Sequence, residues 1–221
     1  MSAPAASPRQ VLVFWFGLER PGKKDDPAVR TVLGEGYEQA ARHRLDAWAE
    51  APRNRLALIL LLDQVPRHLY REDARAFATD LKAQEQTRLF FERGDWTGFP
   101  SLERFYAAMP YLHAEHEQRQ AQVNPVIHAC AASLPQLGFM GRIADLYLET
   151  IRRFGLFPHR NAVRGVPNSA EEQRFLDEVW YPRRHRIEAG AAKASVPRPP
   201  GDSAGGPAAV GDSSATKEER G

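Results

Sequence analysis

The chain has 221 residues, which is enough for one substantial hydrophobic core and favours a single domain. Its formal net charge of +2 is too small to indicate binding to nucleic acid or to an anionic membrane. Because the chain has one cysteine, Cys130, an intramolecular disulfide framework and a cysteine-based zinc site are both excluded.

The sequence carries no obvious targeting segment. The apolar run 11–16 follows no cationic start and is too short for a secretory signal peptide. No stretch approaches the length needed to span a bilayer. We therefore expect a cytoplasmic protein that does not enter the membrane.

The C-terminal part of the chain differs in composition from the rest. Residues 190–221 contain no aromatic residue and only two valines, so nothing there offsets the entropy of ordering the backbone. The sequence therefore predicts a flexible N-terminus at residues 1–9, one helical domain over residues 10–189 and a disordered tail at residues 190–221.

Caps and apolar periodicity predict the first helices. Asp26 and Pro27 are typical of a helix cap and first turn, and apolar residues follow with a helical period to Ala41. Gly34 and Gly36 interrupt this pattern, which indicates a bend or a break into two shorter helices.

The leucine-rich run 56–62 is apolar on every side. Its periodicity fits either a buried strand or a buried helix, but its composition, with one β-branched residue, favours a helix. Pro66 removes one backbone hydrogen bond, so we expect a kink or a restart near Val65. A kink in a buried helix turns the following side chains outward, which favours a cleft at this place.

Two longer helices are expected in the middle of the chain. One runs from about Asp73 to Arg93 and is ended by Gly94. The next is opened by Pro110 and continues to about Leu134.

The last helices are predicted by a clear repeat and a cap. Apolar residues recur with a spacing of three and four from Phe139 to Phe154, and Gly155 ends this helix. The final helix begins at Ser169, which has capping-box spacing to Glu172. Because no alternating strand pattern occurs, the sequence predicts an all-α domain of seven to nine helices.

Three charged residues follow the leucine-rich run. Asp63, Arg67 and Arg71 are spaced at i, i+4 and i+8, and they share one face if the helix continues through Pro66. A carboxylate next to a buried run needs a partner, and arginine is the usual one. Structural ion pairing and contact with a ligand both explain this trio.

His113, His116 and Glu117 have the residue types of a metal site and could share one helical face. The zinc-protease spacing is absent, no second motif supplies further ligands, and a solvated polar face explains the same residues. The sequence also lacks a glycine-rich phosphate loop, a nucleophile elbow and a dinucleotide fingerprint. We therefore expect no metal and no cofactor.

The loop after Phe154 presents His159, Arg160 and Asn161 side by side. Arg160 could hold a carboxylate or a phosphate through two hydrogen bonds, and His159 could donate a proton or a hydrogen bond. The alternative is a loop that ties helices together through hydrogen bonds to free carbonyls.

Four ordered segments resemble a known bacterial family. They are residues 11–17, 56–71 with Leu62-Asp63-Gln64-Val65-Pro66-Arg67, 110–120 with His113-Ala114-Glu115, and 154–161. Together they resemble the family catalogued as domain of unknown function 924, over about residues 10–180. The resemblance implies an all-helical fold similar to tetratricopeptide-repeat proteins and no established activity.

The resemblance also implies a set of polar site positions. Carried over residue by residue, they are Asp63, Gln64, Arg67, Arg71, His113, Glu115, Gln120, Arg153, His159, Arg160 and Asn161.

The chain departs from the family pattern at several positions. Ala114 stands where the family usually has serine, and His68 where it usually has asparagine. Leu156 replaces an arginine and Tyr147 a histidine, and residues 163–166 differ from the usual segment. These departures indicate a changed ligand or a weaker activity in this member.

Two functions without catalysis fit these observations. The first is a module that binds a small anionic metabolite or an acidic peptide end in a polar cleft, with Arg67, Arg71 and Arg160 as the cations. The second is a scaffold for a protein partner, in which the polar network has a structural role only.

A third possible function is an enzyme. A hydrolase or transferase acting on such an anion would use His113 or His159 as the acid or base. Glu115 or Asp63 would orient that histidine.

Overall fold

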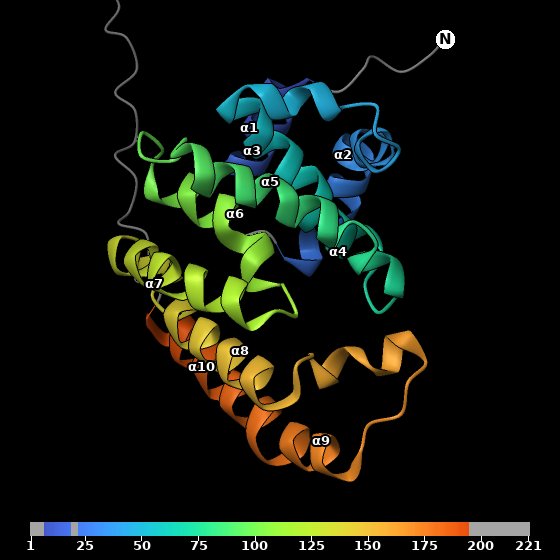
Figure 1. Cartoon of the computed structure of the whole chain (residues 1–221), viewed down its shortest axis with the longest axis vertical. Helices are drawn as coiled ribbons and strands as arrows, with labels where there is room; N and C mark the ends of the chain where they lie inside the picture. Colours follow the sequence, from blue (N-terminus) through green and yellow to red (C-terminus); the bar gives the residue numbers. More distant parts are fainter. Residues whose placement is uncertain (1–6, 19–21, 195–221) are drawn as a thin grey trace, which may run out of the picture.

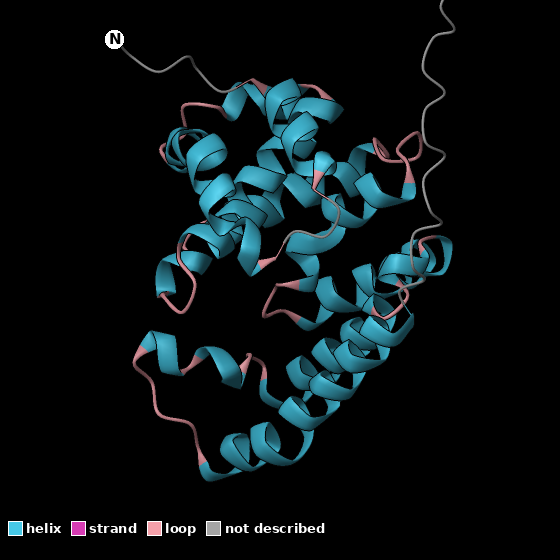
Figure 2. Cartoon of the chain, turned by 180° about the vertical axis from the view of Figure 1, so that it is seen from behind, coloured by secondary structure: helices cyan, strands magenta, loops and turns pink. Residues whose placement is uncertain are grey.

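The computed structural model describes residues 7–18 and 22–194, which form an array of helices joined by loops and short turns (Figures 1 and 2). Most of the predicted flexible N-terminus and most of the predicted tail lie outside the described residues. The last helix continues to Ala194, past the expected domain boundary at residue 189.

All regular structure in the described residues is helical, which confirms the all-α prediction. The α-helices are α1 (Pro8–Gly17), α2 (Asp26–Ala41), α3 (Pro52–Ile59), α4 (Val65–Leu69), α5 (Asp80–Arg93), α6 (Ser101–Leu112), α7 (Glu117–Ser133), α8 (Met140–Phe154), α9 (Ala170–Phe175) and α10 (Tyr181–Ala194). Two π-helical segments, Leu60–Gln64 and Leu176–Trp180, join α3 to α4 and α9 to α10. The described part of the chain therefore has eight continuous helices, and none of them is both long and apolar enough to cross a bilayer.

Two hydrophobic clusters hold the helices together. The larger one is built around the run 56–62, whose residues have no solvent exposure, and it receives side chains from α1, α2 and α5 to α8. The smaller one contains Phe157, Phe175 and Trp180 and packs α8 against the last helices. Helix α7 packs against both α6 and α8, and Figure 1 shows α8 beside α10 below the N-terminal helices.

The expected kink at Pro66 is present as a π-helical turn. Pro66 has no N–H, so it cannot donate to the carbonyl of Leu62. The Thr79 hydroxyl donates to this carbonyl over 2.6 Å, and the Val65 N–H bonds five residues back instead of four. The turn leaves Asp63 in the interior with no solvent exposure.

Helix α2 is continuous, so the predicted break into two shorter helices at Gly34 and Gly36 is wrong. Glycine weakens a helix by about 1 kcal/mol relative to alanine, which is not enough to end a helix with a buried face. Leu33 and Tyr37 bury that face against the core and hold the helix together.

Two predicted helix starts are also wrong. Pro110 lies inside α6 and does not open the next helix, because a proline this close to a helix end removes only one backbone bond. Helix α5 begins at Asp80 and not at Asp73. The Asp73 carboxylate accepts from the Arg75 N–H and starts a separate 3₁₀ turn, Ala74–Phe77.

The predicted ends of the last long loop are confirmed. Helix α8 ends at Phe154, and Gly155 follows with a φ of 71°, which side chains with a Cβ rarely adopt. Ser169 and Glu172 form the expected capping box at the start of α9. Both ends of the loop that carries predicted site residues are therefore fixed by local sequence.

Candidate functional site

Five buried or nearly buried charged and titratable side chains meet where four distant segments converge. We call this group the central polar cluster; it consists of Asp63, Arg67, Asp80, His113 and Arg160. The π-helical turn supplies Asp63, α4 supplies Arg67, and the first residue of α5 is Asp80. His113 follows the last turn of α6, and Arg160 comes from the loop after α8. The cluster thus joins segments up to 97 positions apart in sequence.

Asp63 is the buried carboxylate on which the cluster is organised. Its Oδ1 lies 2.8 Å from the Nδ1 of His113 and 3.3 Å from the Nη1 of Arg67. The Gln64 amide donates to its Oδ2 over 2.5 Å. Burial alone raises the pKa of this carboxyl, but the charge of Arg67 and the hydrogen bonds from His113 and Gln64 more than offset burial and lower the pKa to about 2.

The charge of Asp63 decides which nitrogen of His113 carries the proton. An ionised carboxylate can only accept, so the Nδ1 of His113 must donate to it. Burial and the nearby Arg67 lower the pKa of His113, which favours the neutral ring. The Nε2 of a neutral ring protonated on Nδ1 carries a free lone pair and can act as a base.

Asp80 lies between two arginines but is mainly engaged by one. Arg67 Nη2 lies 3.0 Å from its Oδ2, where it donates a hydrogen bond, and 2.9 Å from its Oδ1, where the contact has ion-pair distance without hydrogen-bond geometry. Arg160 Nη1 stays 3.6 Å from the Oδ2. Burial, together with the charge of Asp63, raises the pKa of Asp80. The ion pair between Arg160 and Asp80 is therefore longer than the one between Arg67 and Asp80.

Arg160 is buried with little polar compensation. The residue is 5% exposed, its Nε has no hydrogen-bond partner, and its guanidinium donates no hydrogen bond to another described residue. The guanidinium lies 4.6 Å from the ring centroid of Phe77 and 4.5 Å from that of Phe157. Burial and the charge of Arg67 lower its pKa.

His159 and Tyr147 lie beside the cluster on the aromatic ring of Trp180. The His159 ring stacks on it at 4.4 Å and the Tyr147 ring at 5.2 Å between centroids. The buried Nδ1 of His159 has no partner, and no hydrogen bond links the Tyr147 hydroxyl to another described side chain. Burial and the charge of Arg160 lower the pKa of His159 to about 3, so the ring is neutral.

Two further predicted site residues hold the cluster together from outside. The Glu115 carboxylate accepts from the Phe157 N–H over 2.9 Å and from Arg164 over 2.9 Å, which ties the loop after α8 to the α6–α7 turn. The buried Gln120 amide donates to the carbonyls of Leu112 and Ala114 and fixes the same turn. Both residues position the cluster and do not belong to it.

The remaining predicted residues lie elsewhere. Arg71 follows the end of α4 and pairs with Asp26, so the i+8 spacing does not bring it to Asp63. Arg153 pairs with Glu171 on the surface. The Asn161 amide donates to Asn168 over 2.9 Å, within its own loop.

The arrangement of His113, His116 and Glu117 differs from the one-face geometry of a helical metal site. His113 caps the end of α6, whereas His116 precedes α7, so a turn separates them. No group of three potential metal ligands occurs in the described part of the chain.

Sequence reasoning missed Asp80 and the aromatic surroundings of the site. Asp80 was expected in the middle of a helix, and it is the first residue of α5 instead. Phe77 comes from the 3₁₀ turn before it, and Trp180 from the π-helical segment before α10. Tyr147 was marked only by its departure from the family pattern. No local pattern connects these residues with the loop after α8.

Comparison with known proteins places the chain in a family. The model of the family described as "Bacterial protein of unknown function (DUF924)" matches residues 8–179. A solved structure of a protein of unknown function from Agrobacterium tumefaciens is similar, with 28% sequence identity and a TM-score of 0.68, covering 77% of this chain and 97% of that chain. No curated protein matches the chain. Because the family model spans most of the sequence, the chain belongs to this bacterial family of unknown function.

Proposed function

We propose that the central polar cluster binds a small anion that carries a carboxylate or a phosphate, either as a free metabolite or at the end of an acidic peptide. The observation that carries the proposal is the state of Arg160, which is buried while its guanidinium makes no hydrogen bond within the described residues. A buried guanidinium normally donates hydrogen bonds to nearby acceptors, because burying its N–H groups without hydrogen-bond partners is unfavourable. A ligand oxyanion would supply them.

The neighbours of Arg160 leave its guanidinium without a hydrogen-bond acceptor. Asp80 accepts a hydrogen bond from Arg67 and stays 3.6 Å from Arg160, and Asp63 is engaged by His113 and Arg67. The planar guanidinium matches a carboxylate or phosphate in a two-bond geometry. Its aromatic neighbours, Phe77 and Phe157, contribute cation–π contacts but no hydrogen-bond acceptor oxygen.

Two polar groups beside Arg160 fit the same ligand. The Tyr147 phenol lies within the range of charge interaction with both Arg67 and Arg160, and its hydroxyl has a hydrogen to donate. The neutral His159 ring can donate or accept one hydrogen bond. An anion held by Arg160 would therefore have two neutral hydrogen-bonding groups beside it.

We expect a small anion to raise the melting temperature of the full chain and Arg160→Met to abolish the rise. A ligand at a hundred times its dissociation constant stabilises the fold by about 2.7 kcal/mol. The measurement is a thermal-shift series with phosphate, phosphate monoesters and mono- and dicarboxylates. Arg153→Met is the matched control, since Arg153 also lies over two aromatic rings but is about half exposed and paired with Glu171.

The opposite result would assign the cluster a structural role. If no anion stabilises the natural chain and Arg160→Met melts at a lower temperature, the network only holds the helices together. A search for a protein partner would then be the next step.

A second candidate function is catalysis by His113. The specific observation in its favour is the 2.8 Å contact between the Nδ1 of His113 and Asp63, which leaves the Nε2 as a base next to the anion site. Such a pair could activate water or a hydroxyl for attack on a bound ester or phosphate ester.

For catalysis, we expect His113→Gln to lower turnover while binding of the anion persists. General base catalysis contributes about 10² to 10⁴-fold, so the loss in kcat should lie in that range with little change in KM. The substrates for this assay are esters and phosphate esters of whichever anions give a thermal shift. Equal turnover by His113→Gln and the natural chain would remove His113 from the mechanism.

A further inference from the structure

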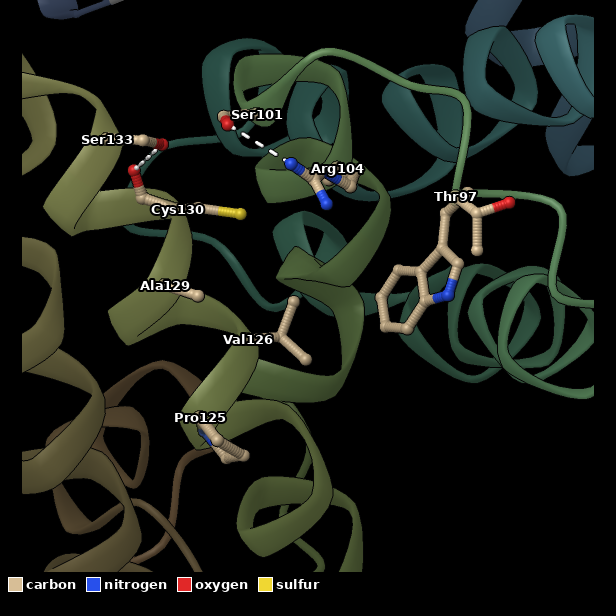
Figure 3. Close-up of a pocket in the computed structure, with 9 residues that line it drawn as sticks. Thr97, Ser101, Arg104, Pro125, Val126, Ala129, Cys130 and Ser133 are labelled. Atoms are coloured by element: carbon tan, nitrogen blue, oxygen red, sulfur yellow. Dashed lines mark hydrogen bonds between the residues drawn. The ribbon is translucent and has the colours of Figure 1, made fainter.

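A pocket lies beside the first turn of α6, whereas His113 of the central polar cluster follows the last turn of the same helix (Figure 3). The pocket has a volume of about 430 Å³, within the range of small-molecule sites. Its walls come from the loop after α5, the first turn of α6 and the second half of α7. Arg104 in this pocket and His113 in the cluster are nine residues apart on the same helix, a separation of about 14 Å along the helix axis.

Most of the pocket surface is apolar. Trp96 supplies an indole ring that packs edge-on against Phe91 at 4.1 Å between centroids. Across from it, α7 contributes Pro125, Val126 and Ala129, all labelled in Figure 3. These walls favour an aliphatic or aromatic ligand body, because burying apolar surface is the main source of affinity in such sites.

Arg104 is a cation in this pocket without a carboxylate partner. Its Nη2 donates a long hydrogen bond of 3.3 Å to the Ser101 hydroxyl, and its buried Nε has no partner. Figure 3 shows this guanidinium beside the thiol of Cys130. Among the described residues, Arg104 forms no ion pair, which is unfavourable for a guanidinium beside apolar walls.

The acidic residues nearest to it in sequence are already engaged. Glu103 forms two hydrogen bonds with Arg53, at 2.9 and 3.0 Å. Asp95, one residue before Trp96, pairs with the fully buried Arg55. An acceptor for Arg104 therefore has to come from outside these pairs.

We propose that this pocket binds a small organic monocarboxylate with an apolar chain or ring. Its carboxylate would pair with Arg104 and accept from the Ser101 hydroxyl, while its body would lie against Val126, Ala129 and Trp96. A phosphate monoester fits less well, because a second negative charge would find no second cation in the lining.

The test is calorimetric titration of the full chain with sodium octanoate, with octan-1-ol as the uncharged ligand of the same length. We expect octanoate to bind more tightly than octan-1-ol, and Arg104→Met to weaken octanoate by at least about tenfold. Methyl NMR of the natural chain should show shifts at Val126 and Ala129. Ala129→Phe fills the pocket from an exposed position and should abolish binding without unfolding the chain.

Four results would overturn the proposal. Equal affinity for octanoate and octan-1-ol would mean that Arg104 does not contribute. Unchanged octanoate binding in Ala129→Phe, or methyl shifts at Leu62 and Val65 beside the central polar cluster with none at Val126 and Ala129, would place the ligand elsewhere. Absence of binding by both octanoate and 3-phenylpropionate at millimolar concentration would exclude this ligand class.

Discussion

Acidification below pH 6.5 is expected to destabilise the protein, and His159→Phe is expected to remove a large part of this loss. Burial and the charge of Arg160 lower the pKa of His159 to about 3, whereas the pKa of a histidine in an unfolded chain is about 6.5. As the pH falls, the unfolded chain takes up a proton that the folded chain does not accept. The free energy of unfolding therefore decreases from pH 6.5 downward until the folded state also titrates, near pH 3.

The size of the effect follows from the difference between the pKa values of His159 in the unfolded and the folded chain. One pKa unit corresponds to about 1.4 kcal/mol, so His159 alone accounts for roughly 2 kcal/mol by pH 5 and up to about 5 kcal/mol by pH 3. The pKa of His113 and that of His68 are also lowered by burial, so the natural chain loses further stability in the same direction. The difference between natural chain and variant isolates the contribution of His159.

The measurement is urea denaturation of the natural chain and His159→Phe from pH 8 to pH 5. Phenylalanine keeps the stacking on Trp180 and removes a buried nitrogen that has no partner, so the variant should be at least as stable at pH 8. Below pH 6.5 its stability should fall less steeply than that of the natural chain. Parallel curves for the two proteins would contradict the buried, neutral state of His159.

Asp63→Ala is expected to lower the free energy of unfolding by about 3–5 kcal/mol, because the buried Arg67 and His113 would lose the carboxylate with which they interact. Arg67 would keep only Asp80, and His113 would lose the acceptor of its Nδ1 hydrogen. A loss of this size is a large fraction of the stability of a typical domain. Asp63→Asn should be milder, since an amide oxygen can still accept from one of the two donors.

Asp145→Ala is the matched control for this experiment. Asp145 also pairs with a histidine, His128, at 2.9 Å, but both side chains are 47% exposed. Exposed pairs contribute at most about 1 kcal/mol, so the control should remain close to the natural chain. The measurement is urea denaturation at pH 7.5 with unchanged m-values. Equal losses for the Asp63 and Asp145 variants would mean that the central polar cluster is open to water.

The sequence identified four of the five residues of the central polar cluster and missed Asp80. Asp63, Arg67, His113 and Arg160 were found because each stands next to a strong local signal, such as an apolar run, a proline or a glycine stop. The partner that joins two of them, Asp80, has no such signal. It reaches Arg67 and Arg160 only because α5 begins where the π-helical turn and the loop after α8 come together.

The prediction from residue spacing was wrong for Arg71, because the helix contains a π-helical turn and ends before this residue. The i, i+4, i+8 rule that grouped Asp63 with Arg71 assumes an unbroken α-helix. The π-helical turn, and the end of α4 at Leu69, turn Arg71 away to Asp26. The rule holds for Arg67, one turn from Asp63, since the i+4 neighbour still reaches its carboxylate.

Local sequence was sufficient to predict the helical class, the irregular turn at Pro66 and the stops and caps around the loop after α8, such as Gly155. These features depend on residues within a few positions of one another, whose conformational preferences act locally. The meeting of Asp63, Asp80 and Arg160 in one buried cluster depends on contacts between distant helices and could not be predicted from local sequence. Packing of the two hydrophobic cores brings these residues together, and the loss of water at that place sets their charges and leaves Arg160 in need of a partner.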